Sequence, residues 1–431
     1  MMIHLQKTKI LTAFVCMLVC PKFAASSASA GGYTDIIVDQ NGSGNFRTIT
    51  EAVGALPMYP YRRTVIYVKN GIYPEKLRIA QNYITLRGEN RDSTIIRFSQ
   101  LRSDYAAEQD GIGPAVVNIH GDDMVLDNLT IENSQPEIGP HAFAVYGDAT
   151  RTVITNCKLI SRGADTVSLW NYKNGMYYHA RCVFEGAVDM VCPRGWCLIR
   201  DSQFFEIKET AALWHDGHYD PGQKFVIWNS SFDGVKGFQL GRHHYPCQFF
   251  FMNCVFSERM SPEPIYRRRE DDPARDNPDY YGERIYFYRC RKDGEPFDWY
   301  KDNLNLAVDV HGPDQITPSW TFGGAWDPES ERPVKVTGCE VRGKSMLLTF
   351  NEIVSVRGEP VIKSQSGGTF RISIQRYNDI NKLAFESEEN IDPDDLAGLF
   401  SMDEGAILAS IASVSERHLE PFFRIPRLQI K

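Results

Sequence analysis

A short segment of alternating apolar residues recurs at intervals of 20 to 36 residues through the middle of the chain. A small or polar residue lies near the centre of each copy, and these markers are Asn128, Cys157, Cys182, Ser202, Ser230, Cys254 and Cys290. Repeats with such variable spacing are typical of a solenoid, in which each coil buries its apolar side only against neighbouring coils. The sequence therefore predicts a stack of short parallel strands joined by loops of unequal length.

Two aspartates occupy matching positions in consecutive repeats. Asp165 lies in Gly-Ala-Asp-Thr-Val, and Asp189, 24 residues later, lies in Gly-Ala-Val-Asp-Met-Val. Stacked strands lie about 4.8 Å apart, so we expect the two carboxylates to be neighbours on one face. Close carboxylates raise each other's pKa unless a cation intervenes, which suits a proton donor beside a nucleophile. The alternative is that both aspartates cap turns between coils.

Short strands separated by Gly, Asn and Asp precede the markers. The expected strands are residues 64–68, 84–86, 94–98, 116–119 and 124–131. No helical pattern of about 10 to 15 residues lies between them, which favours a solenoid over a doubly wound sheet. Ile49, Ala52, Val53 and Leu56 have helical spacing and predict a short helix that covers the first coil.

The composition turns polar around residues 326–333, and the pattern changes beyond that point. The expected strands there are residues 334–341, 345–350, 360–363, 369–375 and 406–412. They predict a small β-sandwich that resembles bacterial immunoglobulin-like accessory modules. We therefore divide the chain into a signal peptide at 1–30, a β-helix domain at 31–332 and a β-sandwich accessory domain at 333–431.

The first 30 residues have the pattern of a secretory signal. Lys7 and Lys9 precede an apolar stretch at 10–20, and Ala-Ser-Ala at 28–30 supplies small residues for cleavage. The apolar stretch is too short to anchor a helix in a bilayer. We expect export to the periplasm or the cell exterior. Such a location permits a disulfide between Cys157 and Cys182 on neighbouring coils, although buried packing as small apolar residues is the default.

Composition narrows the class of partner. The net charge of the 431-residue chain is −8, and no basic run with interleaved aromatic residues occurs, which argues against a nucleic-acid partner. The 24% of charged residues and 42% of hydrophobic residues fit a globular protein. We expect a monomer with no membrane span. The charged excursion at 267–281 is expected to be a solvated loop.

Several short motifs follow one another in an order that resembles the pectin methylesterase family. They are the entry segment 39–48, Gly-Ile-Tyr-Pro-Glu at 71–75, Ala-Asp-Thr at 164–166, Gly-Ala-Val-Asp at 186–189 and Leu-Gly-Arg at 240–242. The resemblance extends over roughly residues 33–325. It implies a right-handed, single-stranded parallel β-helix.

The resemblance also implies an acyl-transfer mechanism without a serine. Asp189 would attack the carbonyl of a methyl-esterified uronate in a pectic polysaccharide, and Asp165 would protonate the departing methanol and then activate water. Arg242 would keep Asp189 ionised and oriented through charge-assisted hydrogen bonds. The mechanism needs no metal and no organic cofactor.

The chain departs from the family at the oxyanion donors. The glutamine of the family's Q-D-T segment is Ala164 here, which cannot donate, and the glutamine of its Q-A-V-A-L segment aligns with His141. A histidine is able to replace that donor, although a lone histidine is more often structural. Losing one oxyanion donor typically lowers the rate about a hundredfold to a thousandfold.

The residues expected to face the substrate also differ. Met190 and Cys192 follow the nucleophile where the family has aromatic residues, Ser168 replaces a tyrosine, and His243 and His244 replace Pro-Trp after Leu-Gly-Arg. This pattern suggests retained chemistry on a branched pectin region or an unusual uronate ester.

Other side chains allow two interpretations. Trp170, Trp196 and Trp214 are candidate sugar platforms, with core packing as the alternative. The histidines of His-Asp-Gly-His at 215–218 and of His-His at 243–244 invite a metal site, but they lack a full ligand set on one element. We therefore expect no metal.

The sequence leaves three classes of function open. The first is an exported carbohydrate esterase. Ala164 supports the second, a catalytically impaired β-helix that binds pectin. The third is a lyase or glycosidase on the same fold, because paired aspartates also serve glycosidases. Arg242 and the order of the motifs favour the esterase.

Overall fold

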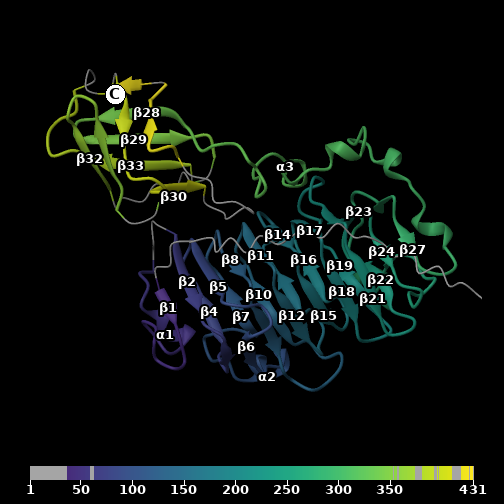
Figure 1. Ribbon diagram of the computed structural model, residues 1–431. Coiled ribbons are helices and arrows are strands. Elements are labelled where there is room, and N and C mark those ends of the chain that lie inside the picture. The colour runs from purple at the N-terminus through teal and green to yellow at the C-terminus, as the bar shows by residue number, and fades with distance from the viewer. Residues whose placement is uncertain are drawn as a thin grey trace, which may run out of the picture. The chain divides into compact units, whose positions relative to one another are not determined.

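The computed structural model describes residues 36–58, 63–352, 354–356, 359–373, 381–392, 396, 398–409, 419–426 and 428–430. The expected signal peptide lies outside these described residues. Three long parallel sheets form a parallel β-helix, and a largely antiparallel sheet follows (Figure 1). The expected fold class is thus confirmed.

Each complete coil of the β-helix contributes one strand to each of three sheets, whereas the first coil contributes only β1 and the last only β26 and β27. Sheet 1 consists of β1 (Ile36–Val38), β2 (Thr64–Val68), β5 (Ile84–Gly88), β8 (Val125–Asp127), β11 (Thr152–Thr155), β14 (Met176–Ala180), β17 (Trp196–Arg200), β20 (Phe225–Trp228), β23 (Gln248–Met252) and β26 (Arg284–Tyr288). Sheet 2 consists of β4 (Leu77–Ile79), β7 (Ala115–Ile119), β10 (Phe143–Gly147), β13 (Val167–Leu169), β16 (Val191–Pro193), β19 (Ala211–Trp214), β22 (Gln239–His243) and β25 (Tyr266–Arg267). Sheet 3 consists of β3 (Gly71–Tyr73), β6 (Thr94–Phe98), β9 (Thr130–Asn133), β12 (Lys158–Ser161), β15 (Val183–Gly186), β18 (Gln203–Glu206), β21 (Ser231–Gly234), β24 (Val255–Phe256) and β27 (Arg291–Lys292).

On seven coils, from the one that begins with β8 to the one that begins with β26, a single residue in the left-handed region turns the chain from sheet 1 into sheet 3. The residues are Asn128, Asn156, Arg181, Asp201, Asn229, Asn253 and Arg289, with φ between 48° and 58°. Asparagine and aspartate tolerate this conformation better than most residues. The expectation of one continuous strand at 124–131 was wrong, because Asn128 separates β8 from β9. The marker equivalent to Cys157 is therefore Leu129, since Thr130 pairs with Lys158.

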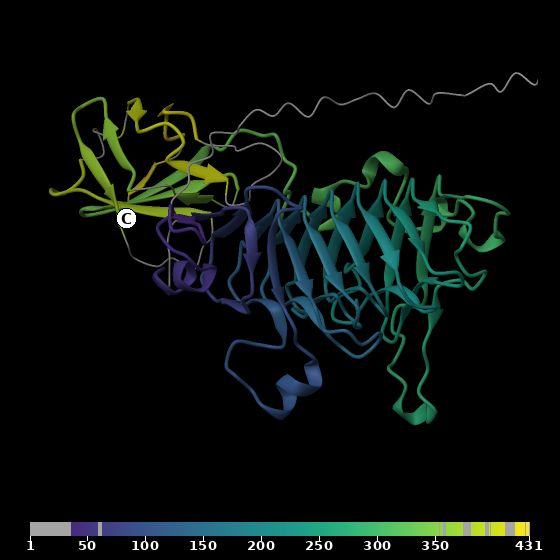
Figure 2. The ribbon, with the colours of Figure 1, turned by 60° about the horizontal axis from the view of Figure 1, so that its bottom comes forward.

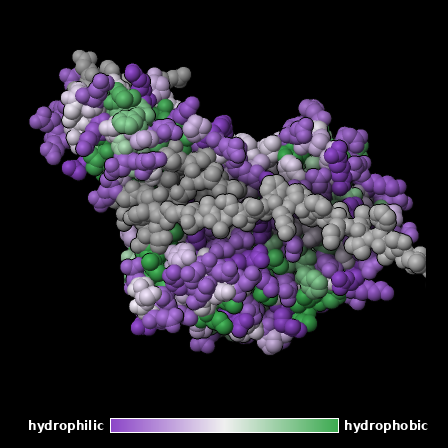
Figure 3. All heavy atoms as spheres, in the orientation of Figure 1, coloured by the Kyte–Doolittle hydropathy of each residue, from purple (hydrophilic) through white to green (hydrophobic). Residues whose placement is uncertain are grey.

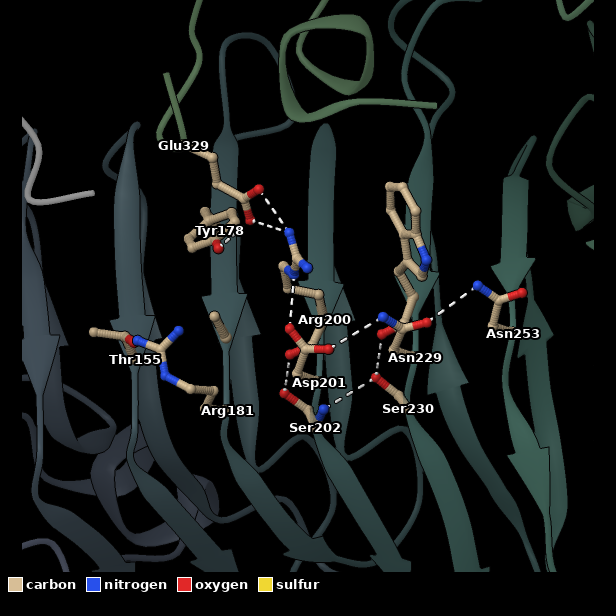
Figure 4. Close-up of polar contacts among 12 residues, drawn as sticks. Thr155, Tyr178, Arg181, Arg200, Asp201, Ser202, Asn229, Ser230, Asn253 and Glu329 are labelled. Atoms are coloured by element: carbon tan, nitrogen blue, oxygen red, sulfur yellow. Dashed lines mark hydrogen bonds and ion pairs between the residues drawn. The ribbon is translucent and has the colours of Figure 1, made fainter. Parts of the chain in front are cut away.

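Side chains at this turn bond from coil to coil. Asn253 Nδ2 donates to Asn229 Oδ1 at 3.1 Å, and Asn229 Nδ2 donates to Asp201 Oδ1 at 3.3 Å (Figure 4). On the inner side, the Ser202 backbone N–H donates to Ser230 Oγ at 3.2 Å. These bonds satisfy polar groups along the stack and help to fix its register.

Aromatic rings fill the interior of the β-helix. Phe204 stacks on Phe184 with 5.0 Å between ring centroids and on Phe232 with 4.3 Å. The described cysteines are all free thiols, and Cys157 and Cys182 are buried in the same core. They act as small apolar residues of the stack.

A segment with little regular structure packs outside sheet 1. It contains η3 (Leu304–Leu306), η4 (Pro313–Gln315) and α3 (Pro318–Thr321), whereas the preceding η2 (Asp298–Tyr300) packs Tyr300 against Phe256 of the interior core. Glu329 closes this segment onto the sheet, because Arg200 Nη1 donates to its two carboxylate oxygens at 2.8 and 2.6 Å and the Tyr178 hydroxyl donates to Oε1 (Figure 4).

The residues after 333 form a separate apolar core. Sheet 4 consists of β28 (Val336–Arg342), β29 (Ser345–Phe350), β31 (Val361–Ser364), β32 (Thr369–Ile372), β33 (Lys382–Glu386), β34 (Phe400–Ser401), β36 (Phe422–Phe423) and β37 (Leu428–Ile430). A second, two-stranded sheet pairs β30 (Val354–Val356) with β35 (Ile407–Ala409). Gly343, at φ 58°, makes the tight turn between β28 and β29.

The expected capping helix is α1 (Ile49–Gly54), and a capping box between Thr48 and Glu51 begins it. Two excursions leave the β-helix on the same side, one with α2 (Arg102–Ala107) and one with η1 (Pro273–Arg275) (Figure 2). On the face shown in Figure 3 hydrophilic residues predominate. Within the described ranges, no helix has the length and apolar character needed to cross a bilayer.

Candidate active site

The outer face of sheet 2 brings together side chains from successive coils. Val167 pairs with Val191, and both side chains point into the core. Because side chains alternate along a strand, the neighbouring residues of β13 and β16 face the outer side of the sheet. Ser168 pairs with Cys192, and Trp214 pairs with Arg242 on later coils. The site is therefore a column across β13, β16, β19 and β22.

Asp165 and Asp189 lie at equivalent positions of adjacent coils, as the spacing predicted. The pairing of Val167 with Val191 sets the register two residues later, and the Asp165 N–H donates to the Val188 carbonyl at 3.0 Å. Both aspartates have positive φ, 62° and 57°. Non-glycine residues in this region mark turns or strained sites, so the chain holds both carboxylates on a sharp bend.

Gly186 makes this bend possible. A Cβ atom at residue 186 would lie 2.2 Å from Thr166 Oγ1 on the preceding coil. The glycine in Gly-Ala-Val-Asp is therefore required by the close approach of two coils.

Arg242 holds Asp189 through a two-pronged contact. Its Nε donates to Asp189 Oδ1 at 2.9 Å, and its Nη2 donates to Oδ2 at 2.7 Å. Burial raises the pKa of Asp189 to about 6, against the lowering effect of Arg242. The ionised carboxylate therefore predominates at neutral pH, and its orientation is fixed by the fork of the guanidinium.

Asp165 has no such direct cation. Ser168 Oγ donates to its Oδ2 at a long 3.4 Å, and Cys192 Sγ lies 3.2 Å from the same Ser168 oxygen. Burial raises the pKa of Asp165, and the charge of Arg194 opposes that shift. Asp189 is thus the carboxylate that an arginine holds directly, whereas the Asp165 carboxylate accepts a hydrogen bond from the Ser168 hydroxyl.

An arginine that the sequence analysis missed lies between two indoles. The Arg194 guanidinium carbon lies 4.1 Å from the ring centroid of Trp170 and 4.3 Å from that of Trp214. Arg102 lies 5.8 Å from the Trp170 ring. Trp170 and Trp214 therefore lie on either side of a cation, and their role as sugar platforms stays a prediction. The three residues follow one another at 24 and 20 residues, which are intervals of the coil repeat, so the repeat spacing is the signal that could have found this contact.

Glu206 stabilises the bend that precedes Asp189, and the sequence analysis did not identify it either. Its Oε1 accepts the Val188 N–H at 3.3 Å and the Lys208 N–H at 3.0 Å. The side chain is fully buried, and burial raises its pKa to about 9. Glu206 is thus a neutral carboxylic acid at neutral pH that fixes the residue preceding Asp189.

His141 lies beside Ala164 in an isolated parallel bridge. Ala164 itself is buried. Burial lowers the pKa of His141, with a further contribution from Arg102. A neutral imidazole next to the two aspartates retains one N–H donor.

The structure corrects two expected substrate contacts. Met190 is fully buried in the apolar core, so it offers no surface to a substrate. His243 is also fully buried, with Nδ1 bonded to the Tyr245 carbonyl at 2.8 Å. His244 remains near the site, 6.3 Å from Trp214 between ring centroids, and burial lowers its pKa to about 4.

Trp196 belongs to a different face. It lies on β17 of sheet 1, and its Nε1 donates to the Gly222 carbonyl at 2.9 Å. His215 uses Nε2 and Nδ1 in contacts with the backbone of Gly195 and Gln248. Among the residues that the structure describes, no group of three or more His, Cys, Asp or Glu side chains is arranged to hold a metal ion.

Comparisons with known proteins find similarity to pectinesterases. Residues 35–220 match the family model described as Pectinesterase. Probable pectinesterase 67 of Arabidopsis thaliana is 23% identical over 344 residues, which are 75% of this chain and 91% of that protein. Pectinesterase 31 of the same plant is 29% identical over 163 residues, which are 36% of this chain and 50% of that protein. The chain thus spans half the length of the latter relative.

Solved structures show the same fold. Pectin methylesterase from carrot superimposes with a TM-score of 0.55 at 20% identity, covering 68% of this chain and 94% of that chain. Pectin methylesterase PemA from Erwinia chrysanthemi gives 0.55 at 19% identity, covering 69% and 98%.

The fold and the site define a parallel β-helix protein with an aspartate pair and an arginine on one open sheet. Through this β-helix domain the chain is similar to the pectinesterase family, whose model matches residues 35–220.

Proposed function

We propose that the protein hydrolyses methyl esters of uronic acids in pectin. The observation that carries the proposal is the Asp189 carboxylate, clamped by Arg242 at 2.9 and 2.7 Å one coil away from Asp165. A nucleophile that is ionised and aimed beside a carboxyl group with raised pKa is what a two-step acyl transfer needs.

Asp189 attacks the ester carbonyl carbon, and the C–O bond to the methoxy group breaks to leave an acyl-enzyme anhydride. Asp165 gives its proton to the departing methoxide, so that methanol leaves. The ionised Asp165 then takes a proton from water as the hydroxide adds to the acyl carbon. Cleavage of the anhydride releases the uronate and restores both aspartates.

His141 is the candidate for the oxyanion donor that Ala164 lacks. It lies next to Ala164 across the coil, and its lowered pKa keeps the imidazole neutral. The indoles of Trp170 and Trp214, with Arg194 between them, and the nearby His244 line the expected substrate path.

Methanol release from methyl-esterified pectin is the direct test. The wild-type protein should release methanol, Asp189→Asn should release none, and both should keep the same circular dichroism spectrum. Pectin binding without release by the wild type would favour a non-catalytic binding protein, for which Ala164 is the supporting observation. Shortened or unsaturated products would favour a glycosidase or a lyase.

We further propose that the protein is exported by the segment at 1–30 and that residues 333–431 form an accessory domain. The distinct apolar core after residue 333 supports the second point. Amino-terminal sequencing of the exported protein, and expression of 31–332 alone, test the two statements.

A further inference from the structure

Two cysteine side chains meet at the last coils of the β-helix. Cys254 directly precedes β24, and Cys290 directly precedes β27 (Figure 1). These are the last two strands of sheet 3, and their register pairs Val255 with Arg291. The Arg291 N–H donates to the Cys254 carbonyl at 3.0 Å. The two cysteines are therefore equivalent residues of neighbouring coils.

The positions of the two side chains suit a disulfide. Neighbouring strands of a sheet lie about 4.8 Å apart, and Cα atoms that a disulfide joins are usually about 4.4 to 6.8 Å apart. Cys254 is buried in the apolar core, and Cys290 packs against the same core. Cys290 Sγ lies 3.3 Å from the carbonyl oxygen of Phe251, on the coil of Cys254. The two thiols are hydrogen-bonded to each other, so their sulfur atoms already face one another.

The two thiols differ in access and in acidity. Cys254 is fully buried, and burial raises the pKa of its thiol. Cys290 is partly exposed, and its hydrogen bond with Cys254 lowers the pKa of its thiol. The thiolate, rather than the thiol, attacks a disulfide. Cys290 is therefore the residue that an external disulfide reaches first, and Cys254 lies ready to resolve the product.

A second pair of cysteines in the same column is shielded. Cys157 and Cys182 directly precede β12 and β15, which pair with each other. Both side chains are buried in the middle of the stack, and burial raises the pKa of both thiols. Cys182 Sγ donates to the carbonyl oxygens of Ile154 and Ala180 at 3.4 and 3.3 Å. The structure thus supplies an internal control for the exposed pair.

We propose that Cys254 and Cys290 are oxidised to a disulfide by exchange with a small-molecule disulfide such as oxidised glutathione. The Cys290 thiolate attacks one sulfur atom of the oxidant, forms a mixed disulfide and releases one thiolate. The Cys254 sulfur then attacks the Cys290 sulfur and releases the second thiolate. The two protons of the protein thiols end on the two released thiols, so the oxidant takes up two electrons from the cysteine pair. Export, as proposed above, brings the chain to a compartment where disulfides persist.

The disulfide closes a loop that includes a strand beside the candidate active site. β25 lies between the two cysteines in the chain, and its Tyr266 pairs with Arg242 in sheet 2. The charged excursion with η1 belongs to the same loop. Joining the ends of a loop restricts the unfolded chain and so favours the folded one. The cross-link therefore holds the last coils together next to Arg242.

The test compares the full-length protein after incubation with reduced and with oxidised glutathione. In denaturant, the oxidised sample should have two fewer thiols that react with a chromogenic thiol reagent. Mass spectrometry of a non-reduced digest should show Cys254 joined to Cys290. The oxidised protein should also melt about 5 °C higher than the reduced one. Cleavage by a protease within residues 267–281 should give fragments that separate on a denaturing gel only after reduction.

The first variant removes the pair itself. Serine is the replacement, because Ser202 and Ser230 occupy the same column on the coils between the two cysteine pairs. Cys254→Ser/Cys290→Ser should lose no thiols on oxidation and should show no rise in Tm. Its circular dichroism spectrum should match that of the wild type.

The shielded pair gives the matched control. Cys157→Ser/Cys182→Ser should behave like the wild type, with the same fall in thiol number and the same rise in Tm. An unchanged thiol number in the oxidised wild type, or a cross-link that joins any other two cysteines, would overturn the proposal. Mapping of the wild-type peptides decides this even where a variant fails to fold. The thiol number needs no substrate, so its outcome is independent of the proposed esterase activity.

Discussion

Replacement of Glu206 by glutamine should remove a large dependence of stability on pH. Burial raises the pKa of this carboxyl group from 4.5 to about 9 in the folded protein. The folded state therefore keeps its proton at pH values where the unfolded chain has lost it. Stability from this group is complete below the unfolded pKa and is lost as the pH rises through the folded pKa.

The magnitude follows from the two pKa values. Each pH unit between them costs about 1.4 kcal/mol, so the wild type should lose about 4 kcal/mol between about pH 5 and about pH 8 through this group alone. Glutamine has the same shape and stays neutral, and its amide oxygen still accepts the N–H groups of Val188 and Lys208. Glu206→Gln should therefore show a pH dependence that is flatter by this amount.

The assay is urea unfolding followed by tryptophan fluorescence at a series of pH values. Glu185→Gln is the control, since Glu185 lies on the outer side of the adjacent strand β15 and is only partly buried. It should follow the wild type. Parallel curves for wild type and Glu206→Gln would refute the argument for a buried neutral acid.

Three further outcomes are expected from the same geometry. Glu206→Ala leaves two backbone N–H groups unpaired and should destabilise the fold by about 1 to 3 kcal/mol while lowering kcat, whereas Glu206→Gln keeps kcat; equal kcat in both variants would contradict a role in positioning Asp189. Because the pKa of Asp189 is about 6 and its ionised form reacts, the rate of methanol release should fall as the pH drops below 6. Arg242→Gln should lower kcat and move this acidic limb of the pH–rate profile to higher pH. An unmoved acidic limb would refute the assignment. Phe204→Ala breaks the ring stack of the core and should lower the unfolding free energy by about 3 to 5 kcal/mol, measured in urea, whereas exposed Phe205→Ala should change it little.

Much of the fold was predictable because each coil of a solenoid repeats the same pattern of apolar and turn residues along the sequence. The limits of β2, β6 and β29 agree with the expected segments, since alternation and turn residues are local signals. The strand expected at 124–131 was too long because it contains Asn128, whose left-handed conformation turns the chain without a Gly or Pro to mark it.

The equivalence of Asp165 and Asp189 followed from spacing alone, and the position of Arg242 followed from the family motif. The direction of nearby side chains did not follow. Met190 comes directly after two residues with positive φ, Val188 and Asp189, which reset the alternation of faces and turn it into the core. The rule that successive side chains of a strand point to opposite faces therefore does not hold across such a bend.

The sequence by itself determined the coil repeat and the pairing of the two aspartates, because these depend on residue type and spacing along one chain. It also favoured the class of chemistry that we propose. Tertiary structure alone decided that Glu206 is buried and neutral and that the side chains of Met190 and His243 are buried. Each of these features depends on which side chains of different coils contact one another and on how far they are shielded from solvent. Burial and cross-coil contact set those charges, and neither quantity is carried by a local pattern.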